Sequence, residues 1–164
     1  MTGRHIVVMG VSGCGKSEVG ERIAQALHLP LIEGDAFHPP ANIAKMKSGV
    51  PLDDADRAGW LDVLARELAA RRGGAVLTCS ALKRAYRDRL RAASAGLRFV
   101  HLSLPEAEAQ KRVAARSEHF MPPALVASQF AALEDPAGEP GVLTVDARLP
   151  LDEVAARAVS ALRA

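Results

Sequence analysis

The segment GVSGCGKS at positions 10–17 constrains the fold of this chain more than any other part of its sequence. It fits the pattern G-x-x-x-x-G-K-[ST], in which glycines let successive backbone N–H groups turn toward a bound phosphate chain. The β-branched run HIVVM at positions 5–9 precedes it, and an amphipathic helical pattern at positions 16–27 follows it. A strand that enters a helix through such a loop is typical of proteins that bind a nucleoside triphosphate. We therefore predict that this chain binds a nucleoside triphosphate.

Each position of this phosphate loop has an expected role. Lys16 would reach the β- and γ-phosphates, and the hydroxyl of Ser17 would ligate Mg²⁺. Cys14 stands where Ser or Thr is more usual, but the chemistry needs only its backbone N–H, so function should survive. The expected ATP-binding residues of the loop are Gly10, Val11, Ser12, Gly13, Cys14, Gly15, Lys16 and Ser17.

Short apolar runs alternate with amphipathic segments along the rest of the chain. Strands are expected at positions 5–9, 31–32, 75–79, 97–102 and 141–145. Helices are expected at positions 16–27, 53–71, 81–93, 105–116, 122–133 and from 151 to the end. Such alternation implies crossover connections and a parallel sheet that helices cover on both faces. We predict an α/β fold in a single domain over residues 1–164.

Composition excludes several classes of protein. With 164 residues, a net charge of +2 and no concentrated basic stripe, the chain does not resemble a nucleic-acid binder. Its one short N-terminal apolar run predicts neither a signal peptide nor a membrane span. The two cysteines, Cys14 and Cys79, show no disulfide-framework spacing, which favours free thiols in a reducing compartment. We expect a cytoplasmic protein that does not bind membranes.

The second predicted strand ends in acidic residues, LIEGD, whereas the third, AVLTC, offers no acid. Ligands of doubly wound sheets bind at the carboxyl ends of the strands, so Asp35 should face the phosphate loop. There it could orient an acceptor hydroxyl, accept its proton, or hold a magnesium-bound water, a role that Glu33 could also take. Alternatively, Asp35 only caps the following turn. His38, before two prolines, could contact a substrate or simply close the loop.

Three longer blocks resemble one kinase family. They are GVSGCGKS, GDAFHPPANIAKMKSGVPLDDADRAGWL at positions 34–61 and CSALKRAYRDRLR at positions 79–91. Together they resemble the small P-loop gluconokinases of bacteria and eukaryotes, and the similarity runs from position 7 to about 136 and more weakly to the end. Shikimate and adenylate kinases share the phosphate loop but not the other two blocks.

This resemblance implies a three-layer P-loop kinase fold with a five-stranded parallel sheet in the order 2-3-1-4-5. It also implies a substrate-binding insertion at about 36–72, a mobile lid at about 112–124, and a homodimer. The reaction would convert ATP and D-gluconate into ADP and 6-phospho-D-gluconate, with Mg²⁺, and would feed gluconate into central carbon metabolism. Two alternatives stay open: a kinase of another small hydroxy acid such as shikimate, and a regulatory module that binds ATP without turnover.

The resemblance also assigns residues to the sugar-acid pocket. Asp35 and His38 would contact hydroxyls with Asn42 and Lys45 nearby, while Lys83 and Arg87 would suit the gluconate carboxylate or lie on a solvated helix face. Near the lid, Arg112 and Arg116 would share a helical face and either neutralise the transferring phosphoryl group or form only a charged surface. The expected catalytic residues are thus Lys16, Asp35, Arg112 and Arg116.

Three further expectations concern the surroundings of the pocket. Arg148 and Pro150 would pack on the adenine. The residues expected to cap and brace the Trp60 helix rather than touch the sugar are Asp53, Asp54, Asp56 and Arg57. The chain departs from the family pattern at 118–120, where Glu precedes the His-Phe pair and a Gly is usual, which leaves the role of His119 open.

Overall fold

The computed structural model describes residues 4–116 and 122–164, and its centre is a five-stranded sheet whose paired strands are all parallel. The strands are β1 (Arg4–Met9), β2 (Leu31–Glu33), β3 (Gly74–Thr78), β4 (Arg98–Ser103) and β5 (Val142–Asp146). Their spatial order is β2-β3-β1-β4-β5, which confirms the order that the resemblance implied. The first strand therefore lies at the middle of the sheet, between β3 and β4.

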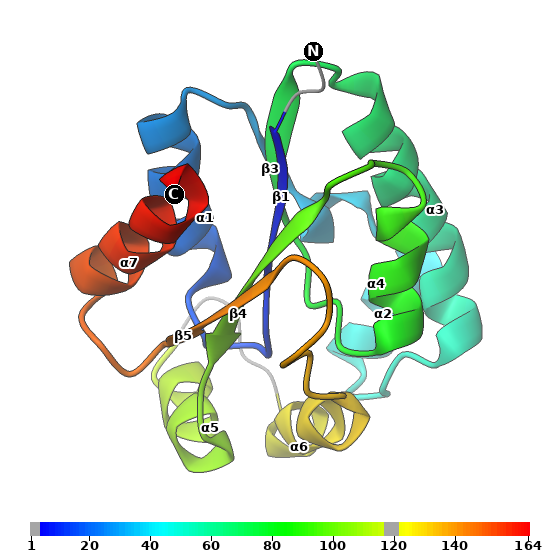
Figure 1. Cartoon of the computed structure of the whole chain (residues 1–164). Coiled ribbons are helices and arrows are strands. Elements are labelled where there is room, and N and C mark those ends of the chain that lie inside the picture. The colour runs from blue at the N-terminus through cyan, green and yellow to red at the C-terminus, as the bar shows by residue number, and fades with distance from the viewer. Residues whose placement is uncertain (1–3, 117–121) are drawn as a thin grey trace.

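Helices cover both faces of this sheet (Figure 1). On one side lie α1 (Lys16–Leu27) and α7 (Leu151–Arg163), and on the other α3 (Asp54–Ala70) and α4 (Arg84–Arg91). The short α5 (Glu106–Ala114) and α6 (Pro123–Ala132) sit beyond the carboxyl ends of the strands, where ligands of parallel sheets bind. None of the helices in the described ranges is long and apolar enough to cross a membrane.

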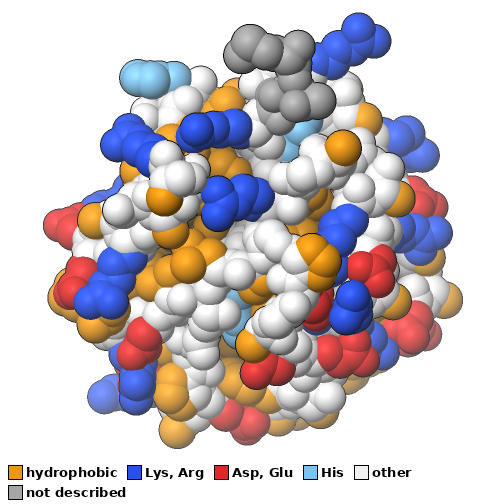
Figure 2. All heavy atoms as spheres, viewed as in Figure 1, with side chains coloured by type: hydrophobic (Ala, Val, Ile, Leu, Met, Phe, Trp, Pro, Cys, Tyr) orange, Lys and Arg blue, Asp and Glu red, His pale blue; other side chains and the backbone are white. Residues whose placement is uncertain are grey.

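Strand β1 alternates its side chains between two hydrophobic cores. Ile6 and Val8 pack with α1 and α7, whereas Val7 and Met9 pack with α3, including Trp60. All four side chains are at most 1% exposed, which explains why the strand reads as a continuous apolar run rather than an alternating one. On the outer surface, acidic and basic side chains both occur, with hydrophobic atoms between them (Figure 2).

Two segments differ from the sequence expectation. Residues expected as a loop after β2 contain a 3₁₀ turn, η1 (Gly34–Phe37), and a helix, α2 (Pro40–Lys47). Pro40 opens that helix because its fixed φ suits the first turn and its missing N–H is not needed there. The helix expected at 81–93 begins only at Arg84, since Ala81 has a positive φ of 46° and Lys83 has an extended backbone with ψ 150°.

The start of α3 is fastened by the acidic residues that the sequence assigned to capping. Asp53 accepts from the Asp56 N–H at 2.7 Å, and the Asp56 carboxylate accepts from the Asp53 N–H at 3.0 Å, which forms a capping box. Asp54 accepts hydrogen bonds from Lys83 and Tyr86, so it ties α3 to α4. The capping prediction is confirmed for these three residues, whereas Arg57 lies elsewhere, as described below.

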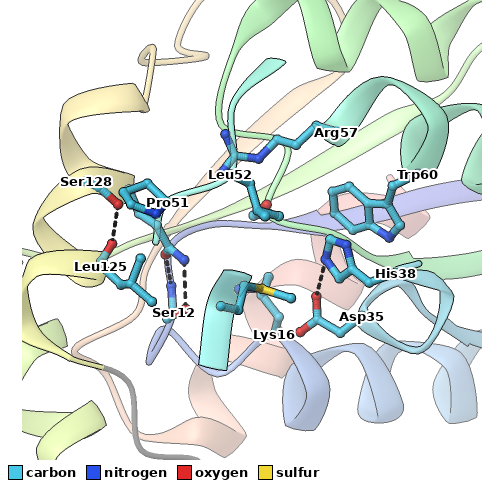
Figure 3. A pocket seen from close by; sticks show the side chains of 13 residues that line it. Ser12, Lys16, Asp35, His38, Pro51, Leu52, Arg57, Trp60, Leu125 and Ser128 are labelled. Atoms are coloured by element: carbon cyan, nitrogen blue, oxygen red, sulfur yellow. Dashed lines mark hydrogen bonds and ion pairs between the residues drawn. The ribbon is translucent and has the colours of Figure 1, made fainter. Parts of the chain in front are cut away.

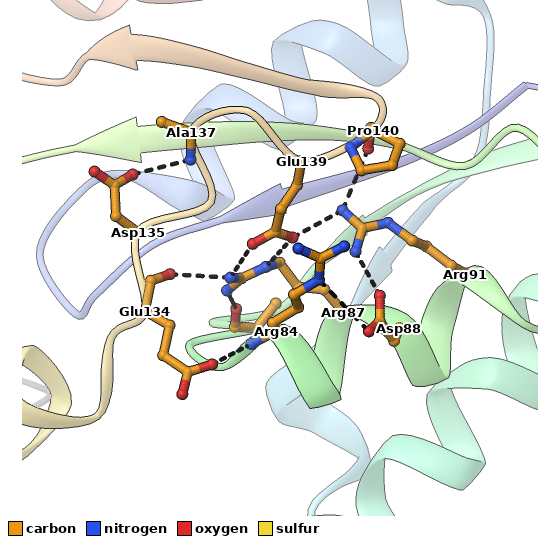
Figure 4. Close-up of polar contacts among 10 residues, drawn as sticks. Arg84, Arg87, Asp88, Arg91, Glu134, Asp135, Ala137, Glu139 and Pro140 are labelled. Atoms are coloured by element: carbon orange, nitrogen blue, oxygen red, sulfur yellow. Dashed lines mark hydrogen bonds and ion pairs between the residues drawn. The ribbon is translucent and has the colours of Figure 1, made fainter.

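Arg87 forms a buried ion cluster (Figure 4), and it lines none of the cavities described below. Its side chain is fully buried, and it pairs with Glu139 at 2.6 Å through Nη2 and 2.9 Å through Nε. The remaining donors bind the Ala81 and Glu134 carbonyls, and Arg91 adds a second guanidinium to Glu139 at 3.0 Å. The expectation that Arg87 holds a substrate carboxylate is corrected, because its hydrogen-bonding capacity is used within the fold.

This cluster joins α4 to the segment before β5. The two guanidinium groups, Arg87 first, hold the pKa of the Glu139 carboxyl down at about 2, although burial of the group opposes them. A carboxyl whose pKa falls on folding stabilises the native state fully above its unfolded pKa of about 4.5. That stabilisation is lost as the pH falls from about 4.5 toward about 2.

We expect Glu139→Gln to lower the free energy of unfolding by about 3 kcal/mol at pH 7, because it leaves a buried guanidinium without its counter-charge. Urea unfolding followed by circular dichroism measures this. The deficit should shrink as the pH falls from about 4.5 toward about 2, where the wild-type carboxyl is protonated too. Glu153→Gln, in an exposed pair with Arg157, is the control and should cost under about 0.5 kcal/mol. Equal small losses in both variants would contradict a stabilising cluster.

Candidate active site

The phosphate loop lies between β1 and α1, at the carboxyl end of the central strand. Gly10 has a φ of 145°, and a Cβ there would lie 2.7 Å from Cys14 Sγ and 2.9 Å from the Leu102 carbonyl oxygen. Gly13 and Gly15 also have positive φ, 87° and 93°. Helix α1 starts directly after Gly15 without a side-chain cap, so its first N–H groups remain available to phosphate oxygens.

Lys16 and Cys14 point in different directions from this loop. Lys16 Nζ donates to the carbonyl oxygens of Gly10 and Val11, at 3.0 and 3.2 Å, across the loop. The Cys14 side chain packs among the hydrophobic residues shared by α1 and α7, and burial raises the pKa of its thiol. The Cys14 side chain is therefore part of the hydrophobic core, although the residue also borders the cavity on the α5 side of the loop.

A cavity beside Lys16 is lined by polar groups from five separate parts of the chain: the phosphate loop, the segments after β2 and β3, and the helices α3 and α6 (Figure 3). Asp35 and His38 come from the segment after β2, and Arg57 and Trp60 come from α3. The other lining residues are Ser12, Met46, Pro51, Leu52, Ser80, Leu125, Ser128 and Gln129. The Asp35 side chain is 86% exposed, so its carboxylate is accessible to a ligand in front of Lys16.

The orientation of His38 is set by its neighbours. Its ring stacks on Trp60 with a centroid distance of 4.1 Å, and Trp60 Nε1 donates to the Gly34 carbonyl at 2.8 Å. Asn42 Nδ2 donates to the Asp56 carbonyl at 2.9 Å, which fixes the amide, so the same NH₂ group faces His38 Nδ1 at 3.3 Å. Nδ1 must then accept, and the ring proton sits on Nε2, 3.7 Å from Asp35 Oδ1. Burial lowers the pKa of His38, which favours this neutral form.

Arg57 brings a cation to the cavity, which sequence reasoning missed. Its Nη1 donates to Tyr86 Oη at 3.4 Å, and its guanidinium lies 5.6 Å from the Tyr86 ring centroid. The side chain extends from α3 toward the cavity (Figure 3). Spacing could have revealed it, because Arg57 stands three positions before Trp60 and shares its helical face.

Four predicted substrate residues do not line this cavity. Asn42 is 2% exposed and lies behind His38. Lys45 pairs with Asp56 at 2.7 Å, and Lys83 pairs with Asp54 at 2.9 Å, so both lysines fasten α3. With Arg87 in its buried cluster, all four contact the frame of the pocket in this structure. The expectation of direct contact is corrected for the buried Asn42 and Arg87, and it stays a prediction for Lys45 and Lys83, whose side chains are 39% and 32% exposed.

The groups beside Ser17 suit magnesium. Ser17 Oγ donates to Glu33 Oε2 at 3.2 Å, and Thr78 Oγ1 donates to the same oxygen at 2.6 Å. Ser17, Glu33 and Asp35 line one cavity and offer only oxygen ligands. Within the described residues no cluster of three or more His, Cys, Asp or Glu could hold a metal alone. Mg²⁺ fits such a sparse site because it keeps several waters and binds substrate phosphates.

A further cavity adjoins the phosphate loop on the side of α5. Arg112 donates to the Ala147 carbonyl at 2.9 Å and the Gly13 carbonyl at 3.4 Å, and it lines this cavity with Arg116. Helix α5 ends at Ala114, so Arg116 lies beyond the helix rather than on its face as expected. The middle of the predicted lid, with Glu118, His119 and Phe120, falls outside the described residues.

The cavity on the side of α5 is not lined by the residues that were expected to contact the adenine. Arg148 pairs with Asp146 at 3.0 Å, and Pro150 precedes the first turn of α7. Neither lines the cavity, whereas Ala147, Leu149, Leu151 and Val154 do. The apolar side chains of this segment, and not Arg148 and Pro150, therefore face the space beside the phosphate loop.

Comparison with known proteins places these features in a family. A family model described as an AAA domain matches residues 6–139. A gluconokinase of Gluconobacter oxydans is 48% identical over 87% of this chain and 82% of its own length. The thermoresistant gluconokinase of Escherichia coli is 40% identical over 97% and 94%, respectively. The crystal structure of a gluconokinase from Sinorhizobium meliloti has a TM-score of 0.91 at 50% identity, over 98% of this chain and 91% of that one.

Proposed function

The chain belongs to the gluconokinase family of P-loop kinases, and we propose that it transfers the γ-phosphoryl group of ATP to D-gluconate, giving ADP and 6-phospho-D-gluconate. The observation that carries this proposal is the cavity in which Lys16 of the phosphate loop faces Asp35, His38 and Arg57. It combines a phosphate-binding cation, an accessible carboxylate and a second cation in one space. A sugar acid requires these groups, since it has hydroxyls at one end and a carboxylate at the other.

In the proposed reaction the 6-hydroxyl oxygen of gluconate attacks the γ-phosphorus, and the bond between that phosphorus and the bridging oxygen of ADP breaks. Asp35 orients this hydroxyl and takes its proton. The neutral His38 directs its Nε2–H toward the Asp35 carboxylate, 3.7 Å away, which helps to orient that carboxylate. Lys16 and the N–H groups at the start of α1 hold the phosphates in line with the attacking oxygen.

Arg57 is the proposed ligand of the gluconate carboxylate. It is the guanidinium among the cavity-lining residues, and its contact with the Tyr86 ring leaves donors that can form charge-assisted bonds. The insertion at about 36–72 supplies six of the thirteen residues that line this cavity, including His38, Pro51, Leu52 and Trp60. We propose this segment as the substrate-binding part of a single kinase domain.

The nucleotide would lie across the phosphate loop with its base toward α7. Leu149 and Leu151 offer an apolar wall for the adenine, and Arg112 and Arg116 supply positive charge near the phosphates. Mg²⁺ would be held by Ser17, with Glu33 or Asp35 acting through water, and would neutralise the phosphate oxygens during transfer. A homodimer in the cytoplasm that binds neither nucleic acid nor membranes remains part of this proposal.

Measuring ADP release with a panel of acceptors tests the function. We expect turnover with D-gluconate and MgATP, and background rates with shikimate, nucleoside monophosphates or no acceptor. Turnover with shikimate alone would favour the kinase of another hydroxy acid. ATP binding without turnover on any acceptor would favour a regulatory module.

Asp35→Asn tests the general base. The substitution keeps the size of the side chain but removes its charge, so kcat should fall by about 10²–10⁴-fold. The KM for ATP should change little, because the phosphate loop is untouched. Asp62→Asn, which alters a carboxylate paired with Arg89 outside the cavity, is the control. Turnover within a few-fold of wild type would show that Asp35 only caps its turn, and Glu33 would become the next candidate.

Arg57→Met tests carboxylate recognition. Loss of a charge-assisted hydrogen bond worth about 1.5–3 kcal/mol should raise the KM for gluconate by roughly 10- to 100-fold. The KM for ATP should stay within about threefold, because Arg57 reaches the acceptor side of the cavity. Arg66→Met, at an exposed position of the same helix, controls for the loss of a charge. An unchanged gluconate KM would mean that Arg57 only braces Tyr86.

A further inference from the structure

A glutamine on α6 holds the phosphate loop by two hydrogen bonds to a single residue. Gln129 Oε1 accepts from the Ser12 backbone N–H at 2.7 Å, and Gln129 Nε2 donates to Ser12 Oγ at 3.0 Å. The backbone N–H can only donate, so the amide has one possible orientation. Both polar groups of Ser12 that face α6 are therefore engaged by the same side chain, which is 117 positions away in the sequence.

This contact lies where the phosphate loop meets the cavity that contains Asp35 and His38, which is the proposed site of the phosphoryl acceptor and is called the acceptor cavity below. Ser12 and Gln129 line the cavity that also contains Lys16 and Asp35. Ser12 immediately precedes Gly13, whose φ of 87° turns the chain toward the start of α1. The position of the Ser12 peptide therefore determines where the following N–H groups of the loop point.

Helix α6 is itself fixed to the body of the protein. Val126 is fully buried in the core cluster that includes Val11 of the phosphate loop. Beyond the end of the helix, the Glu134 N–H donates to the Leu82 carbonyl at 2.7 Å. A helix anchored in this way can act as a reference against which Gln129 positions the loop.

We infer that Gln129 is a positioning residue for phosphoryl transfer, which holds the phosphate loop through Ser12 in register with the acceptor cavity. The inference rests on the proposed kinase reaction. It assigns Ser12 a different part from the other loop residues: in the described structure its N–H binds α6 rather than standing free for a phosphate. Loss of the contact should disturb the alignment of the γ-phosphate with the acceptor hydroxyl more than the binding of either substrate.

Gln129→Met tests this role, because it keeps the length and packing of the side chain but removes both hydrogen bonds. A misplacement of about 1 Å at a reacting centre can cost about 10²-fold, so we expect kcat to fall roughly 10- to 100-fold. The gluconate Kd should stay within about threefold. Trp60 is the single tryptophan of the chain and lines the acceptor cavity, so its fluorescence can report gluconate binding.

Gln110→Met is the matched control. Gln110 Nε2 donates to the Pro123 carbonyl at 2.9 Å, so this variant removes a glutamine bond to the start of α6 without touching the phosphate loop. We expect its kcat to stay near the wild-type value. A kcat within about threefold of wild type in Gln129→Met, or an equal loss in both variants, would overturn the inference.

Two additional measurements keep the test decisive. Hydrogen exchange at the Ser12 amide in the nucleotide-free protein should become about tenfold faster or more in Gln129→Met, and unchanged exchange would overturn the inference.

Ser12→Ala removes one of the two hydrogen bonds to Gln129. The kcat of the double variant should be no lower than that of Gln129→Met alone, and fully additive losses of kcat would contradict a joint action of the two residues. Wild-type protein inactive on gluconate would overturn the proposed function instead, and Ser12 exchange would still decide whether Gln129 holds the loop.

Discussion

The geometry of the candidate site depends on where the central strand, β1, ends. Strand β1 is covered by hydrophobic cores on both faces, so its carboxyl end can occupy only one position relative to β3 and β4. Gly10 then passes so close to Cys14 Sγ and the Leu102 carbonyl that no side chain fits. The buried sheet thus places the phosphate loop, and every other element of the site is arranged around that loop.

Helix α3 links stability and recognition in the same way. Its capping box uses Asp53 and Asp56, and the Asp56 carbonyl in turn fixes Asn42, which orients His38. One turn further along, Trp60 stacks on that histidine. The groups that cap α3 therefore also hold the side chains of Asn42 and His38 in position.

Three arginines show how burial decides whether a guanidinium binds other protein groups or lines a cavity. Arg87 is fully buried and is matched by Glu139 and two carbonyls, whereas Arg57 lines the acceptor cavity with only a long contact to Tyr86. Arg112 binds the carbonyls of Gly13 and Ala147 and so joins α5 to the nucleotide side. Gln129 of α6 binds the neighbouring Ser12, so both α5 and α6 contact the phosphate loop through side chains.

The sequence alone determined the local parts of this protein. The glycine pattern and Lys16 identify a phosphate loop, the apolar runs identify the five strands, and the strand-end position of Asp35 places it in the cavity, because all three follow from short-range chain geometry. The parallel sheet and its helical layers followed from alternation, and the strand order from the family resemblance. Whether a given cation meets the ligand or another side chain was decided only by tertiary packing. Lys45, Lys83 and Arg87 found carboxylates 11, 29 and 52 positions away, and Gln129 found Ser12 from 117 positions away. No spacing rule reports such distant partners, because they depend on where entire helices pack against the sheet.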